Sequence, residues 1–244
     1  MPYSLRRIAL GSPNKVGISK LRYEAIAEAA KTLKLAREIE HRFELVLANF
    51  NELEVAILDL TFRDMTQQRV RFESYRADRL MLNRKVLNLL STSRMYLHHV
   101  LHLLSDKFGA ESSEVHEANK SMRKQYDSVL GHRVMEALRN YVQHRAMPLH
   151  TITYSAKRVE EQPRGKFRYL VTMHLDVNQL AADKKFKAQV LHELRTIGAK
   201  VELKPFIRDH MASLARVQEE LREILRRNVD SSIEIHEKAL ASWQ

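Results

Sequence analysis

The apolar residues of the first half of the chain recur at steps of three and four, which is typical of long amphipathic helices. A first stripe follows Ser19, a residue suited to capping a helix start, and comprises Ile26, Ala30, Leu33, Ile39, Phe43, Val46, Phe50, Leu53, Ile57 and Leu60. A second stripe comprises Leu80, Val86, Leu87, Leu90, Leu97, Val100, Leu101 and Leu104, and Gly109 should end its helix. The pattern predicts two long helices that pair antiparallel.

A third helical region is expected from Ser112 or Ser113, either of which can cap its start, to about Met147. Gly131 should weaken this region, and Pro148 should stop it because proline lacks the amide hydrogen that a helix needs. The three regions predict a helical bundle over residues 20–147, preceded by an N-terminal arm at 1–19.

The pattern changes after the bundle. Segments 150–157 and 167–177 are rich in β-branched and aromatic residues, and the intervening QPRG supplies turn residues, so a β-hairpin is expected within 148–182. Helical spacing returns at Asp183, stops at Gly198, and resumes after a short strand in KVELKP. We therefore expect a mainly α fold: an antiparallel bundle of long helices, a hairpin, and C-terminal helices over 183–244 that pack on the bundle or form a small lobe.

Composition and charge narrow the classes of protein. The 244 residues include no cysteine, which excludes disulfides, thiolate metal sites and cysteine nucleophiles and fits a reducing cytoplasm. No apolar segment follows Arg6 and Arg7, and no apolar run approaches about 18 residues, so we expect neither a secretory signal nor a membrane span. The formal charge of +11 favours polyanions such as nucleic acid, although the same excess can simply solvate long helices.

One helical segment, residues 130–144, has an unusually polar outer face. At about 100° per residue, Asn140 and His144 share one side of the helix, with Arg139 and Gln143 beside them. A cation, an amide and an imidazole on one small surface are suited to holding a phosphate. The plain alternative is that these residues are the solvated face of a bundle helix.

The sequence of this segment, RNYVQH at 139–144, resembles the Arg-Asn-x-x-x-His motif of the HEPN superfamily. Many members of that superfamily are helical-bundle, metal-independent endoribonucleases, and others are binding domains. Two further Arg-x4-His pairs, at 94–99 and 145–150, lack either the polar residue after the arginine or a continuous helix, because Pro148 interrupts the latter. The resemblance implies a site formed where two copies of the motif face each other, and a context of stress or phage defence.

The residue types of the motif suit RNA cleavage, because RNA carries its own nucleophile in the 2′-hydroxyl. His144 can remove that proton or protonate the leaving oxygen near neutral pH, Arg139 can hold the non-bridging oxygens, and Asn140 can orient the histidine or the phosphate. One motif supplies one histidine, whereas two supply a base and an acid. We therefore predict a homodimer with Arg139, Asn140 and His144 as catalytic residues and no metal or other cofactor.

Further cations are candidates for RNA binding: Arg145, Lys157, Arg158, Arg164, Lys166 and Arg168. A solvated turn explains the hairpin cations equally well. The hairpin tyrosines Tyr154 and Tyr169 can stack on bases or pack as ordinary strand aromatics. His98 and His102 are one helical turn apart, but no carboxylate or third histidine accompanies them in sequence, so we predict no metal site.

The sequence thus supports two hypotheses. The first is a cytoplasmic, homodimeric endoribonuclease that cleaves single-stranded RNA without metal; a toxin with an antitoxin or other regulatory partner is compatible with it. The second is a non-catalytic adaptor that dimerises through its long helices and binds RNA or a protein partner. Two motifs facing each other in a basic cleft favour the enzyme, and motifs far apart favour the adaptor.

Overall fold

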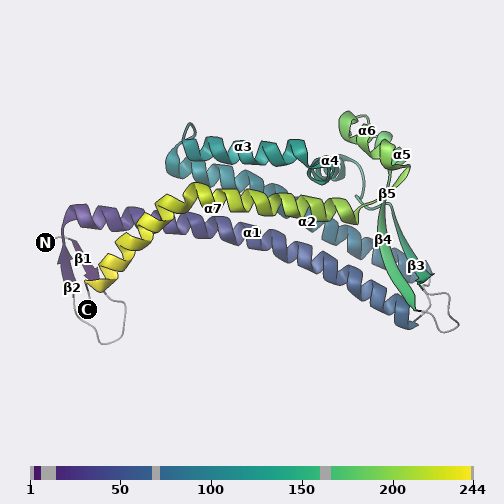
Figure 1. Cartoon of the computed structure of the whole chain (residues 1–244), viewed down its shortest axis with the longest axis horizontal. Coiled ribbons are helices and arrows are strands. Elements are labelled where there is room, and N and C mark those ends of the chain that lie inside the picture. The colour runs from purple at the N-terminus through teal and green to yellow at the C-terminus, as the bar shows by residue number, and fades with distance from the viewer. Residues whose placement is uncertain (1–2, 7–14, 68–71, 160–165, 243–244) are drawn as a thin grey trace.

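The computed structural model describes residues 3–6, 15–67, 72–159 and 166–242, which form seven helices and five strands in an elongated molecule (Figure 1). The predicted mainly α fold, with long helices and a β-hairpin, is confirmed. Within the expected N-terminal arm, strands β1 (Tyr3–Arg6) and β2 (Lys15–Ile18) pair antiparallel. No helix of the described residues combines the length and apolar character needed to span a membrane.

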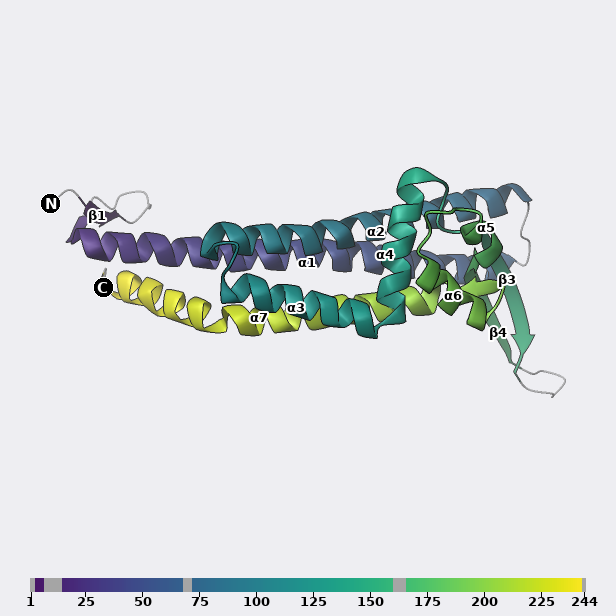
Figure 2. The ribbon, with the colours of Figure 1, turned by 90° about the horizontal axis from the view of Figure 1, so that it is seen from above.

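The two longest predicted helices are α1 (Lys20–Gln67) and α2 (Phe72–Phe108), which run antiparallel along the molecule (Figure 2). Ser19 caps α1 as predicted, since its Oγ accepts the amide of Arg22 at 3.2 Å. Gly109 ends α2 with φ +93°, a conformation that glycine adopts without strain. The predicted stripe of α1 is buried at Ile39, Phe43, Val46, Leu53, Ile57 and Leu60.

The prediction that Leu80 points inward is wrong. Leu80 is 60% exposed, and the buried stripe of α2 begins at Leu82 and continues through Val86 and Leu89. A step of two residues along a helix corresponds to about 200° of rotation. Leu80 therefore lies on the opposite side of α2 from Leu82.

The third predicted region divides into α3 (Ser113–Ser128), capped by Ser112 as expected, and α4 (Leu130–His144). Extended backbone at Val129 (φ −113°, ψ 110°) separates them, and α4 turns across the long helices (Figure 2). The backbone of α4 at Gly131 packs closely against Asp209 and Phe206. A Cβ at this position would lie 2.5 Å from Cβ of Asp209 and 2.7 Å from the carbonyl oxygen of Phe206. The helix ends at His144, before the expected Met147, because the backbone is already non-helical at its C-cap, residue 145.

The last helix, α7 (Lys204–Ala241), lies along α1 and α3 (Figures 1 and 2). Its arginines join it to α1: Arg222 binds Glu40 through two hydrogen bonds of 2.8 and 2.7 Å, and Arg208 binds Glu54 through two of 2.8 and 2.9 Å. Its apolar face enters the same hydrophobic core as α1 and α2, at Leu214, Val217, Leu221 and Leu225. Of the two expected arrangements, α7 therefore packs on the bundle.

The predicted hairpin consists of β3 (Thr151–Arg158) and β4 (Phe167–Asp176), and β5 (Lys200–Glu202) pairs with β4 on its other edge. The helix expected from Asp183 is α6 (Ala188–Ile197), which begins later than predicted and ends before Gly198 as predicted. A short helix that was not predicted, α5 (Val177–Ala181), precedes Asp183. Asp176 caps α5 by accepting the amides of residues 178 and 179, whereas the Asp183 carboxylate accepts the Lys185 amide and forms a turn. Strands β3 and β4 extend away from α4 (Figure 1).

Candidate functional site

Helix α4 presents the polar face that the sequence predicted. Val134, Leu138 and Tyr141 are buried against the bundle, while Asn140 and His144 are exposed. The close packing at Gly131 fixes the start of this helix, and its outer face is left open to solvent at the opposite end.

A cavity of about 170 Å³ lies beside Asn140 and His144. Lys185 and Lys187, from the connection between α5 and α6, line this cavity together with Tyr126. Lys187 donates a hydrogen bond to the Tyr126 hydroxyl and lies 4.5 Å from the centre of its ring. We call this cavity the motif hollow; it combines an imidazole, an amide and two ammonium groups with the carboxylates of Glu136 and Asp183.

Arg145, a predicted RNA-binding residue, forms an ion pair inside the molecule. Its Nε lies 3.3 Å from Oδ1 of Asp183, whose side chain is buried. Burial, with the nearby Asp183 carboxylate, raises the pKa of Tyr141 above its usual value. Arg145 therefore neutralises a buried carboxylate at the edge of the motif hollow.

Arg139 lies on the other side of Asn140 and donates from Nη1 to the Asn140 Oδ1 at 3.1 Å. Arg139 also lines a larger hollow of about 490 Å³ between α2 and α4, with Arg94 and His98. The three predicted catalytic residues thus divide between two hollows of one chain. Asn140 links them, because its side chain binds Arg139 and lines the motif hollow with His144.

The α2 histidines hold no arrangement suited to a metal. The rings of His98 and His102 lie 5.6 Å apart, and His102 Nδ1 is 3.9 Å from the Asp106 carboxylate. His99 Nδ1 accepts the Nε–H of Arg42 at 3.3 Å. Within the described residues, no group of three or more histidine, aspartate or glutamate side chains is placed to bind a metal ion.

The predicted RNA-binding cations of the hairpin lie apart from α4 (Figure 1). Lys157 and Arg168 are direct cross-strand neighbours, and Arg158 and Lys166 are exposed near the tip. Arg164 lies outside the described residues. A single chain therefore does not bring the described hairpin cations to the motif.

Tyr154 is a packing residue rather than an open platform for a base. Its hydroxyl donates to Oδ2 of Asp78 at 2.7 Å, and its ring packs against the core. Burial and the Asp78 carboxylate raise the pKa of this phenol. Tyr169 is half-exposed on the other strand.

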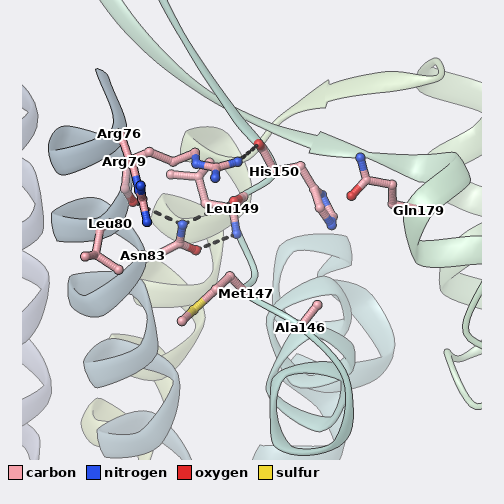
Figure 3. A pocket seen from close by; sticks show the side chains of 9 residues that line it. All are labelled: Arg76, Arg79, Leu80, Asn83, Ala146, Met147, Leu149, His150 and Gln179. Atoms are coloured by element: carbon pink, nitrogen blue, oxygen red, sulfur yellow. Dashed lines mark hydrogen bonds between the residues drawn. The ribbon is translucent and has the colours of Figure 1, made fainter. Parts of the chain in front are cut away.

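The sequence reasoning missed a third hollow, of about 400 Å³, between the first turns of α2 and the segment that joins α4 to β3 (Figure 3). Its polar residues include Arg76, Arg79, Asn83, His150 and Gln179. The one local signal was Asn83, a polar residue directly after the first buried leucine of α2. The remaining residues converge only through the tertiary fold.

Comparison of the chain with protein-family models, curated proteins and solved structures found no match. The functional argument therefore rests on the residues around α4, and the HEPN resemblance of residues 139–144 stays a prediction from the motif.

Proposed function

We propose that α4 carries the active site of a metal-independent endoribonuclease, which cleaves single-stranded RNA and is completed by a second copy of the chain. The observation that carries this proposal is the arrangement of three polar side chains on α4, of which Arg139 and Asn140 are hydrogen-bonded. Asn140 binds Arg139 on one side and lines the motif hollow with an exposed His144 on the other. Lys185 and Lys187 place further positive charge in the same hollow, where an RNA backbone would meet it.

The reaction follows from these groups. The 2′-oxygen of RNA attacks the adjacent phosphorus, the bond from phosphorus to the 5′-oxygen breaks, and a 2′,3′-cyclic phosphate and a 5′-hydroxyl result. His144 accepts the proton of the 2′-hydroxyl, and the partner subunit's His144 donates a proton to the leaving 5′-oxygen. Arg139 stabilises the negative charge on the non-bridging oxygens. A second copy is required because one chain presents one motif histidine.

The test is cleavage of end-labelled, mixed-sequence RNA in EDTA. We expect His144→Ala to reduce the rate by about 10²-fold or more, as is typical for loss of a general acid or base. His236→Ala, which removes an exposed histidine of α7, is the matched control and should leave the rate unchanged. Cleavage that survives in His144→Ala, or that needs an added divalent metal, would overturn the proposal.

A second function, that of a dimeric adaptor, is favoured by an exposed apolar face of α1. Val55, Leu58, Phe62 and Met65 are 62%, 65%, 59% and 44% exposed and follow the three-four spacing of a helix-pairing seam. We call these four residues the α1 stripe. Glu52 pairs with Lys85 of α2 and Glu54 pairs with Arg208 of α7, so charged groups of both signs lie beside this part of α1. We infer that a second copy is the occupant, because such a face is complementary to itself.

The two functions require different dimers. Helices α3 and α4 pack on α2 and α7, whereas α1 packs on α2 and α7 from the other side, so a dimer through the α1 stripe would hold its two motifs apart (Figure 2). Leu58→Glu should leave mass and cleavage unchanged if the enzyme dimer forms across α4. A halved mass by sedimentation in Leu58→Glu, together with no cleavage by the wild type, would instead support the adaptor.

A further inference from the structure

The hollow of Figure 3 has the size and chemistry of a small-molecule site, separate from the motif hollow. We call it the arginine hollow. Its volume of about 400 Å³ lies in the range of ligand pockets, and three different parts of the chain form its walls. Arg76 and Arg79 come from α2, Met147 and His150 from the segment after α4, and Gln179 from α5 (Figure 3).

The two arginines bring positive charge to the hollow. Arg76 and Arg79 are three residues apart and therefore neighbours on one face of α2. Arg79 Nη1 donates to the carbonyl oxygen of His150 at 2.9 Å, which fixes the guanidinium and leaves its other N–H groups available. No acidic side chain of the described residues forms an ion pair with either arginine. Two such groups are suited to binding the oxygens of one phosphate.

The wall behind the arginines is held in place by Asn83, which is 3% exposed. Its Nδ2 donates to the carbonyl oxygen of Leu149 at 3.2 Å, and its Oδ1 accepts the Leu149 amide at 2.9 Å (Figure 3). Both backbone groups of one residue are thereby bound by a single side chain. The segment that carries Met147 and His150 is consequently fixed before any ligand arrives, which lowers the entropic cost of binding.

The far wall holds His150 in one orientation and offers a hydrogen-bond acceptor from Gln179. His150 Nδ1 accepts the amide of Asp176 at 3.0 Å, so the neutral ring carries its proton on Nε2, and this buried nitrogen has no partner among the described residues. Burial lowers the pKa of His150 and favours that neutral form. Gln179 uses its Nε2 on the Asp176 carboxylate, which leaves its carbonyl oxygen as an acceptor.

Two large apolar side chains remain exposed at the hollow: Leu80, at 60%, and Met147, at 49%. A flat heterocycle would cover both of them. We propose that the arginine hollow binds a nucleoside phosphate, with its phosphate on Arg76 and Arg79 and its base against Leu80 and Met147. The ligand is either a free mononucleotide or one nucleotide of an RNA strand.

The test measures binding by calorimetry to adenosine monophosphate, adenosine, inorganic phosphate and a hexa-adenylate RNA. The protein used is His144→Ala, so that binding is measured whether or not the chain cleaves RNA. Arg76→Gln/Arg79→Gln should weaken binding of adenosine monophosphate at least tenfold. Arg84→Gln, which alters another exposed arginine of α2 outside the hollow, is the matched control and should bind normally.

Each result has one meaning. Tighter binding of adenosine monophosphate than of adenosine and of phosphate, lost only in the double variant, supports the proposal with a free nucleotide as ligand. Much tighter binding of the hexanucleotide, with the same dependence on Arg76 and Arg79, supports it with RNA as the source. Equal binding of adenosine monophosphate and inorganic phosphate, unchanged binding in a folded double variant, or no binding of any probe overturns it.

Discussion

At the scale of single residues, Gly131 sets how closely α4 approaches α7. We expect Gly131→Ala to lower the free energy of unfolding by about 1–3 kcal/mol, because its Cβ would overlap backbone and Cβ atoms of α7 that cannot move freely. Urea denaturation measures this loss. Gln143→Ala, on the exposed face of α4, should change stability by less than about 0.5 kcal/mol. Equal stability of Gly131→Ala and wild type would contradict the described packing.

The buried pair His132 and His210 makes stability depend on pH. Their rings lie 4.7 Å apart, and His132 Nδ1 is 2.5 Å from the Ser213 hydroxyl. Burial lowers the pKa of His132 from 6.5 to about 4 and holds that of His210 well below its usual value. The unfolded chain therefore binds more protons than the folded chain between about pH 6.5 and 4, so stability falls as the pH falls through this window.

Each histidine contributes up to about 1.4 kcal/mol per pH unit to that slope. Urea midpoints between pH 7 and 4.5 should decline in the wild type and decline less steeply in His210→Leu. His236→Leu, at an exposed position, should keep the wild-type slope. The same slope in His210→Leu and wild type would show that the buried ring does not titrate on unfolding.

At the scale of elements, Asn83 joins the segment between α4 and β3 to α2. We expect Asn83→Ala to lower the free energy of unfolding by about 2–3 kcal/mol, because the N–H and carbonyl of Leu149 lose their partners inside the protein. Hydrogen exchange of the Leu149 amide should accelerate more than that of amides in the middle of α2. Uniform acceleration over the whole chain would assign Asn83 a general role in stability instead.

Helices with a regular three-four spacing of apolar residues were predictable from the sequence. Helices whose ends are set by contacts with residues far along the chain were not. The buried apolar face of α1, the Ser19 cap and the Gly109 terminus follow from spacing and local hydrogen bonding. Gly131 indicated a weak point in this region, but the complete break at Val129 was not predictable, since the turn of α4 depends on its fit against α7. Helix α5 and the late start of α6 were not predicted, because Asp176 caps one short helix and Asp183 forms a turn before the next.

The candidate site divides in the same way. The exposed face of α4 was predictable, because Asn140 and His144 are one helical turn apart. The lysines of the motif hollow were not, because they come from a loop about forty residues later. The arginine hollow pairs Arg79 with the carbonyl of His150, 71 positions along the chain, and periodicity carries no information on such contacts.

At the scale of the whole molecule, α7 is needed for the bundle to fold. A chain that ends at Leu203 would lose the buried residues Leu214, Val217, Leu221 and Leu225 and uncover the faces of α1 and α3. Four such side chains contribute about 6–12 kcal/mol, which is comparable with the total stability of a domain. The truncated chain should show no cooperative thermal transition by circular dichroism. A cooperative transition would mean that the first helices form an independent unit.

The described ends of the chain lie together at one end of the elongated molecule, and the β3–β4 hairpin lies at the other (Figure 1). A biotin attached beyond Tyr3 or Ser242 would therefore orient every molecule on a sensor surface in the same way. The hairpin and α4 would lie away from the support, accessible to a ligand in solution. Attachment through the hairpin would reverse that orientation. Surface-binding measurements with the two attachment points can therefore be compared directly on the same protein.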